Sequence, residues 1–218
     1  VGDAERERVV DVVESGHLAD GPEVRAFEEA FADYCGTDHA VATNNGTTAL
    51  HAAFEALGIG EGDTVVTSPF SFVASANAVR LAGADPVFAD VDEETFTLDP
   101  DAVEAAVREH DADAVLVVHL YGLPAEMDRL AEVADAHDVE LVEDAAQAHG
   151  AEYDGRRVGS FGDAACFSFY PTKNVTTGEG GMVTTDRSGV ADRTASFVNH
   201  GRPMGDDRSS YDHVRLGH

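Results

Sequence analysis

The chain has 218 residues and a formal net charge of −28 at pH 7, from 42 Asp and Glu against 14 Lys and Arg. Its 43% hydrophobic content suffices for a substantial core, and its acidity excludes nucleic acid and anionic membranes as default partners, because phosphates would be repelled. The apolar runs are shorter than the roughly 18 residues of a transmembrane helix. The two cysteines indicate free thiols, so we expect a soluble, cytoplasmic protein.

Short β-branched runs alternate with Ala-rich amphipathic segments along the chain. Strands that alternate with helices of about ten or more residues are typical of βαβ units, so we predict an α/β fold of three layers, α/β/α, with a mainly parallel sheet. Gly83 is the expected stop of one helix, and Asp99 and Pro100 are the expected cap and first turn of another. In chain order, the expected helices cover residues 23–34, 47–57, 72–82, 100–110 and 125–137, and the expected strands cover 64–67, 86–90, 114–119, 140–143, 163–169 and 181–185.

We expect two parts in this chain. Residues 1–35 form an N-terminal arm and helix, and residues 36–218 form the large domain that carries the site. The arm packs on this domain or on a second copy through its apolar residues, which are Val9, Val12, Val13, Leu18 and Phe27.

Lys173 is the one lysine of the chain, beside 13 arginines. It lies in a polar, glycine-containing loop, residues 170–180, between two expected strands. Arginine can replace lysine in an ion pair, but a guanidinium is not an amine nucleophile. We therefore interpret Lys173 as a residue whose amine is needed for chemistry.

An acidic pair, Glu143 and Asp144, closes an expected buried strand, and ligands of open α/β sheets bind at the carboxyl ends of strands. A carboxylate at this position can pair with the ring nitrogen of pyridoxal phosphate and keep it protonated. Asp144 is the better candidate, because we expect it to project beyond the strand. Glu143 fits a solvated loop carboxylate better.

Two further segments have the composition of binding loops. Residues 44–50 combine a turn-forming Asn-Asn-Gly with a helix start, where free backbone N–H groups and a Thr hydroxyl can bind an anion. Threonine is also an ordinary helix cap, so this signal is weak alone. Residues 68–75 place aromatic rings just after a strand, where a ring can stack on a planar cofactor or pack in the core.

Taken in chain order, these four segments are residues 44–50, residues 68–75, the strand end with Glu143 and Asp144, and the Lys173 loop. Together they resemble the DegT/DnrJ/EryC1/StrS family of sugar aminotransferases, which are pyridoxal-phosphate enzymes of the aspartate aminotransferase fold (fold type I). The resemblance covers nearly the whole chain. The motifs that carry it lie at residues 46–50, 143–148, 167–169 and 178–181, together with Lys173.

The resemblance implies the cofactor pyridoxal 5'-phosphate and a role for each motif. Lys173 would be the catalytic residue, attaching the cofactor covalently and then moving a proton between the substrate carbon and the cofactor. Asp144 would hold the pyridine nitrogen, Gln147 would face the phenolic oxygen and Phe72 would stack on the ring.

The phosphate would be bound by Gly46, Thr47 and Ser168, by the same resemblance. It also implies a homodimer, and a smaller C-terminal domain that these 218 residues lack. We expect no metal site, because the ten histidines show no paired helical spacing of a zinc motif.

The implied reaction moves an amino group from glutamate or glutamine to a keto group of a nucleotide-linked sugar, for surface polysaccharide or glycan synthesis. Two alternatives stay open. One is an enzyme of the same fold that acts on amino acids, for which Arg202 and Arg215 are the candidates to bind a substrate carboxylate. The other is a non-catalytic fragment that binds the cofactor.

The acidity predicts a halophilic protein, since abundant Asp with almost no Lys leaves a self-repelling surface that salt must screen. The Debye length falls to about 3 Å near 1 M salt, so we expect the melting temperature to rise steeply with KCl concentration in a thermal denaturation series. A flat response would indicate an ordinary acidic protein and overturn this inference.

Overall fold

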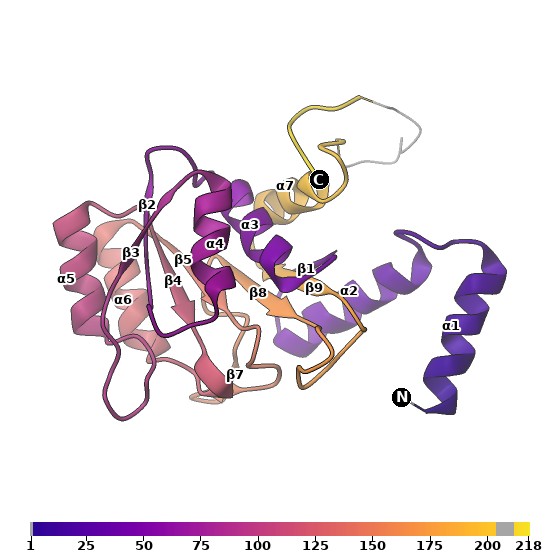
Figure 1. The fold of residues 1–218 in the computed structure, drawn as a ribbon, viewed down its shortest axis with the longest axis horizontal. Helices are drawn as coiled ribbons and strands as arrows, with labels where there is room; N and C mark the ends of the chain where they lie inside the picture. The colour runs from indigo at the N-terminus through magenta and orange to yellow at the C-terminus, as the bar shows by residue number, and fades with distance from the viewer. Residues whose placement is uncertain (1, 204–211) are drawn as a thin grey trace.

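A computed structural model describes residues 2–203 and 212–218 of the chain (Figure 1). Its main sheet has seven strands in the order β1-β9-β8-β5-β4-β2-β3, and a two-stranded sheet pairs β6 with β7. The strands are β1 (His39–Thr43), β2 (Thr64–Thr67), β3 (Asp85–Phe88), β4 (Ala114–Val118), β5 (Glu140–Asp144), β6 (Glu152–Tyr153), β7 (Arg156–Arg157), β8 (Ala164–Ser168) and β9 (Gly181–Thr185). The helices are α1 (Asp3–Ser15), α2 (Pro22–Cys35), α3 (Gly46–Leu57), α4 (Val73–Ala82), α5 (Pro100–His110), α6 (Met127–His137) and α7 (Ser188–Phe197), with a short 3-10 helix at Leu120–Gly122.

The main sheet is largely parallel. Strands β3, β2, β4, β5 and β8 run parallel to one another, while β9 pairs antiparallel with β8 on one side and with β1 on the other. Strand β1 therefore runs in the same direction as the parallel set. The segments that follow β1, β2, β4, β5 and β8 all emerge at one edge of the sheet, which is where the pocket described below lies.

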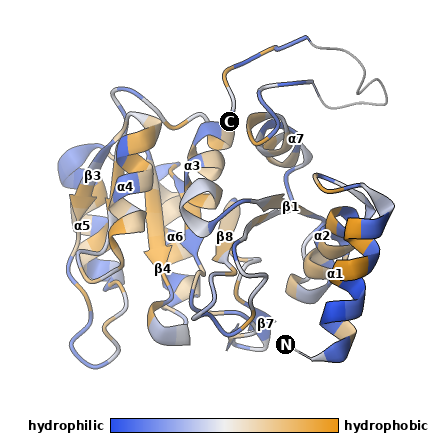
Figure 2. Cartoon of the chain, turned by 45° about the vertical axis from the view of Figure 1, so that its right-hand side comes forward, coloured by the Kyte–Doolittle hydropathy of each residue, from blue (hydrophilic) through white to orange (hydrophobic). Residues whose placement is uncertain are grey.

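Helices cover both faces of the sheet because successive strand residues point to opposite sides. On β2, Val65 belongs to the core under α3 and α4, whereas Val66 belongs to the core under α5 and α6. A third cluster joins Phe31 and Cys35 of α2 to the β8 residue Phe167. In Figure 2, strands β3 and β4 have hydrophobic colours. The predicted three-layer α/β/α architecture is confirmed.

The expected helices and strands all occur, with boundaries shifted by one or two residues at several ends. Gly83 ends α4 in the left-handed conformation with φ of 96°, and the Asp99 side chain accepts a hydrogen bond from Asp101 N at the start of α5. Strand β1, the β6–β7 pair, α1 and α7 were not predicted from the sequence. No helix in the described part of the chain is both long and apolar enough to cross a membrane.

The N-terminal arm divides into two helices with different surroundings. Helix α2 packs on the domain, where Phe27 lies edge-on to Phe169 with ring centroids 5.1 Å apart. Helix α1 buries none of its residues, and Figure 1 shows it standing away from the sheet beyond α2. Its residues Val9 and Val13 stay exposed, so the expected packing on the domain holds for α2 and not for α1.

Glu143 is completely buried, which corrects its interpretation as a solvated loop carboxylate. Its Oε1 accepts hydrogen bonds from Phe161 N (2.7 Å) and Gly162 N (2.9 Å), and its Oε2 accepts from Gly159 N (2.9 Å) and His119 Nε2 (3.0 Å). Burial favours a raised pKa for Glu143, but the donors from His119 and the loop outweigh burial and leave the pKa below its ordinary value. Glu143 therefore anchors the loop that precedes β8.

A second hydrogen bond, at the other ring nitrogen, fixes the tautomer of His119. Its Nδ1 accepts a hydrogen bond from Ala125 N at 3.2 Å, so the ring proton lies on Nε2, where it is donated to Glu143. The buried pair is thus a neutral imidazole beside a carboxylate.

We predict that Glu143→Gln destabilises the fold by about 3 kcal/mol, because an amide NH₂ group would face backbone N–H groups that need an acceptor. The measurement is the free energy of unfolding by urea at constant high KCl. Glu93→Gln is the matched control, since Glu93 is exposed, and its cost should stay within about 0.5 kcal/mol. Equal losses in the two variants would contradict the anchoring role.

Candidate active site

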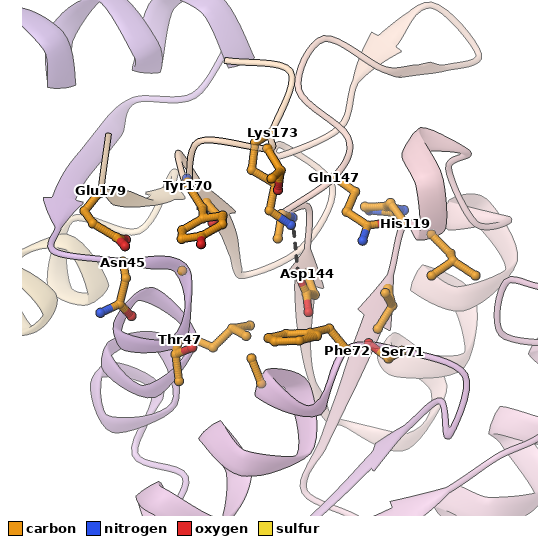
Figure 3. A pocket seen from close by; sticks show the side chains of 18 residues that line it. Asn45, Thr47, Ser71, Phe72, His119, Asp144, Gln147, Tyr170, Lys173 and Glu179 are labelled. Atoms are coloured by element: carbon orange, nitrogen blue, oxygen red, sulfur yellow. Dashed lines mark hydrogen bonds between the residues drawn. The ribbon is translucent and has the colours of Figure 1, made fainter. Parts of the chain in front are cut away.

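A cavity of about 490 Å³ opens at the carboxyl ends of β4, β5 and β8, beside the N-terminus of α3 (Figure 3). Ligands of open α/β sheets bind at this edge. All the site residues expected from the sequence line this one cavity: Gly46, Thr47, Phe72, Asp144, Gln147, Ser168 and Lys173. The other lining residues are Asn45, Leu50, Ser71, Ala74, Val118, His119, Leu120, Ala146, Tyr170, Thr172 and Glu179.

One end of the cavity is formed by the first turn of α3. Asn45 is the helix cap, with its side chain accepting a hydrogen bond from Thr48 N at 2.8 Å, so the cap is an asparagine and not a threonine. The N–H groups of Gly46 and Thr47 are left without an intrahelical acceptor, as in the first turn of any helix. A Cβ at Gly46 would lie 2.8 Å from the Cβ of Ser168. Only glycine allows α3 to approach β8 this closely. Free N–H groups at a helix start are able to bind an anion.

Asp144 lies on the floor of the cavity as the last residue of β5, and not beyond the strand as expected. Its side chain is nearly buried, with the residue 6% exposed. Its Oδ2 accepts a hydrogen bond from Ser75 Oγ at 2.7 Å, and its Oδ1 accepts from Ala146 N at 3.2 Å. Ser75 Oγ lies 2.7 Å from Ser71 Oγ, so a chain of hydroxyls leads from the β2–α4 loop to this carboxylate.

The charge of Asp144 is set by opposing effects. Burial raises the pKa of Asp144, whereas the Ser75 hydroxyl, the Ala146 N–H and the positive charge of Lys173 lower it. Burial dominates, so the pKa of Asp144 lies above its ordinary value. A cationic group placed against this carboxylate would favour its ionised form.

Gln147 presents a donor to the cavity. Its Oε1 accepts a hydrogen bond from Tyr121 N at 2.7 Å, and because a backbone N–H can only donate, this contact fixes the orientation of the amide. The NH₂ group of Gln147 is then the group available to the cavity. This contact also holds Tyr121, whose backbone is left-handed with φ of 54°.

Lys173 reaches the cavity from the loop between β8 and β9. The loop is closed at its base by a hydrogen bond from Phe169 N to Gly180 O of 2.8 Å, and Lys173 N donates to Tyr170 O at 2.9 Å. The lysine is half-buried. In Figure 3 it lies on one side of Asp144 and Phe72 on the other.

Phe72 is the residue that precedes α4, and its side chain lies at the cavity wall with the residue 69% exposed. A ring this exposed is not a core residue. It offers an apolar face to a planar ligand.

Several residues in or beside the cavity were not predicted from the sequence. Ser71 and Ser75 are four residues apart, a spacing that places both near the first turn of one helix and could have suggested a joint role. His119 follows β4 directly, at the edge of the sheet where ligands bind. Tyr170 and Glu179 lie in the Lys173 loop; the motif at residues 178–181 includes Glu179, but no role was predicted for either side chain.

Two further kinds of group were considered from the sequence: arginines that would bind a substrate carboxylate, and metal ligands. Arg202 and Arg215, the candidates for binding a substrate carboxylate, are not among its lining residues. Within residues 2–203 and 212–218, no group of three or more His, Cys, Asp or Glu side chains is arranged to hold a metal ion.

Comparison with known proteins matches the whole chain, residues 1–218, to the DegT/DnrJ/EryC1/StrS aminotransferase family. The chain is 47% identical over 201 residues to the spore coat polysaccharide biosynthesis protein SpsC of Bacillus subtilis, covering 92% of this chain and 51% of that protein. It is 47% identical over 207 residues to a dTDP-3-amino-3,4,6-trideoxy-alpha-D-glucose transaminase of Streptomyces venezuelae, covering 94% of this chain and 53% of that protein.

Among solved structures, the aminotransferase of Psychrobacter cryohalolentis superposes with a TM-score of 0.93 at 38% identity, covering 100% of this chain and 57% of that one. The chain thus spans about half the length of the relatives it matches. The match over all 218 residues, together with this superposition, shows that the chain belongs to the DegT/DnrJ/EryC1/StrS aminotransferase family.

Proposed function

We propose that this chain is the cofactor-holding part of an aminotransferase that moves an amino group from glutamate or glutamine to a keto group of a nucleotide-linked sugar. The observation that carries the proposal is the convergence of Lys173, Asp144, Gln147 and Phe72 on one cavity beside an anion-binding helix start. Enzymes of this family depend on pyridoxal phosphate.

The cavity fits pyridoxal phosphate on structural grounds. The close approach of Gly46 to Ser168 leaves a helix start whose backbone N–H groups suit a phosphate. A nearly buried carboxylate suits a cationic ring nitrogen, and the free NH₂ group of Gln147 suits an anionic ring oxygen. An anion site, an acceptor, a donor and an amine thus occur together, and each meets a different group of this cofactor.

Each residue has a distinct task in this proposal. Gly46, Thr47 and Ser168 bind the phosphate, Phe72 packs on the ring, and Asp144 holds the ring nitrogen in its protonated form. When bound, the cofactor supplies an electron sink that stabilises negative charge on the substrate carbon. The Lys173 amine would hold the cofactor covalently, and its Nζ would carry a proton between the substrate carbon and the cofactor.

The substrate class is supported by the relatives. One is named as a transaminase that makes a dTDP-linked amino sugar, and another as a protein of polysaccharide biosynthesis. The absence of Arg202 and Arg215 from the cavity lining gives no support to the amino-acid alternative. We therefore propose a nucleotide-linked keto sugar as the acceptor and surface polysaccharide or glycan synthesis as the context.

The proposal extends to a halophilic, cytoplasmic homodimer. The exposed apolar side chains of the N-terminal arm, Val9, Val13 and Leu18, support this proposal, because a second copy of the chain would cover them. The two cysteines, Cys35 and Cys166, are buried free thiols, as suits a reducing compartment. The division into an arm at residues 1–35 and a large domain at 36–218 is part of the same proposal.

We predict that pyridoxal phosphate, added in high KCl and reduced with borohydride, leaves a covalent adduct on Lys173 that peptide mass mapping locates. Lys173→Ala should lose the adduct, because Lys173 is the one lysine in these 218 residues. Lys173→Arg is the matched control: it keeps the positive charge and lacks the amine, so it should also lose the adduct. An adduct of unchanged yield in either variant, or one on the amino terminus alone, would contradict the assignment.

We predict that ¹⁵N from labelled glutamate or glutamine appears in a nucleotide-linked keto sugar when the full-length protein that contains this chain is supplied with pyridoxal phosphate. Mass spectrometry of the sugar product measures the transfer. Asp144→Ala should lower the rate at least 100-fold, because the ring nitrogen loses its carboxylate. Transfer to amino-acid keto acids instead of the sugar would favour the alternative enzyme class.

A further inference from the structure

The Asp144 carboxylate accepts a hydrogen bond from a chain of two neutral hydroxyl groups, those of Ser75 and Ser71. No sequence motif predicted this hydroxyl chain. We infer that Ser75, supported by Ser71, is a positioning residue that fixes the orientation and charge of Asp144 for a cationic ring nitrogen and ties this carboxylate to the turn that carries Phe72. The inference rests on the proposed function and deepens it.

The direction of the chain follows from its geometry. Ser75 Oγ donates to Asp144 Oδ2 at 2.7 Å, and a hydroxyl has one hydrogen to give. Ser75 Oγ must then accept in its second contact, which is with Ser71 Oγ at 2.7 Å. The order of donation is therefore Ser71, Ser75, Asp144, with the carboxylate as the final acceptor. Each donor polarises the next, which strengthens the last hydrogen bond.

Neutral donors suit this carboxylate better than a cation. A buried carboxylate needs hydrogen bonds to stay ionised, but an Arg or Lys paired directly with Asp144 would compete with a cationic ring for its charge. The hydroxyl of Ser75 and the N–H of Ala146 stabilise the carboxylate without neutralising it. A carboxylate has about four acceptor positions, so capacity remains for a ligand in the cavity.

The hydroxyl of Ser75 is the side-chain group that donates a hydrogen bond to Asp144. Two titratable groups that line the cavity beside it are Lys173 on the β8–β9 loop and His119 after β4. On the neighbouring strand β8, Cys166 is its register partner, and burial together with the charge of Asp144 raises the pKa of that thiol. Glu143 precedes it on β5 and accepts hydrogen bonds from the other side.

The same chain restrains Phe72. This residue lies between Ser71 and Ser75 in sequence, and its ring, being largely exposed, has little packing to hold it. Ser75 is 1% exposed and sits in the first turn of α4, where its N–H donates to Phe72 O at 3.1 Å. The hydrogen bond to Asp144 therefore sets the position of the stacking residue relative to the carboxylate on β5.

The test compares Ser75→Ala, Ser75→Thr and Ser71→Ala with the control Ser196→Ala. Ser196 is also a buried serine, on α7, and its hydroxyl has no hydrogen-bond partner among the described residues. The first measurement is the titration of Asp144 in cofactor-free protein, by ¹³C NMR of labelled aspartate carboxyl groups, assigned with Asp144→Asn. The second is the dissociation constant for pyridoxal phosphate from absorbance, and the third is the urea unfolding midpoint.

We expect Ser75→Ala to raise the pKa of Asp144, because a donor to the charged form is lost, and to weaken pyridoxal phosphate binding about tenfold. Ser75→Thr should restore both properties, since it keeps the hydroxyl. Ser71→Ala should give a smaller change in the same direction, and Ser196→Ala should match the parent in both.

Two results would overturn the inference. One is a Ser75→Ala variant with the parent's Asp144 titration and only a lower unfolding midpoint, which would mean that Ser75 acts through packing. The other is a Ser75→Thr variant as impaired as Ser75→Ala. If the parent protein forms no adduct on Lys173, the proposed function fails, while the Asp144 titration still decides the role of Ser75.

Discussion

The burial of two adjacent carboxylates at the end of β5 is the constraint on which the site depends. In a chain whose acidic residues mostly face solvent, Glu143 and Asp144 are both withdrawn from water, and a buried charge is costly unless it is compensated. The two are compensated separately. Glu143 is saturated by four donors from His119 and the 159–162 loop, whereas Asp144 has two donors and keeps accepting capacity on the cavity side. One carboxylate builds the scaffold and the other stays available for a ligand.

The second constraint is the close approach of the start of α3 to strands β8 and β9. It places the helix start next to the strands that flank the Lys173 loop. A Cβ at Gly46 would meet Ser168, and a Cβ at Gly181 would lie 2.4 Å from Asn45 O. The first turn of α3 is therefore pressed against the start of β9 and the end of β8, the strands that flank the Lys173 loop. The helix start and the base of the lysine loop are therefore in close contact, and these two glycines leave the space that this contact needs.

Local signals predicted most of the architecture, since each acts within a few residues. Gly83 stops α4, Asp99 caps α5, and the alternation of strand and helix predicted the parallel sheet. Lys173 was found by composition. The hydroxyl chain was not found, because Ser75 and Asp144 are 69 residues apart and only the fold brings them together. The burial of Glu143 was also not predicted. Three of its four donors are backbone N–H groups, which no side-chain pattern encodes.

The net charge of the chain limits which groups can hold the phosphate. A surface with a net charge of −28 repels an anionic cofactor at long range, so a phosphate must be held by groups in direct contact with it. Basic side chains would be the usual choice, but the chain has one lysine, and the proposed chemistry uses its amine. Backbone N–H groups at the start of α3 and hydroxyls such as those of Thr47 and Ser168 carry no charge that salt can screen, and the helix dipole adds to them at short range. A site built from neutral donors therefore loses less affinity with rising salt than a cluster of basic residues would. The neutral hydroxyl chain behind Asp144 follows the same rule at the opposite end of the cavity.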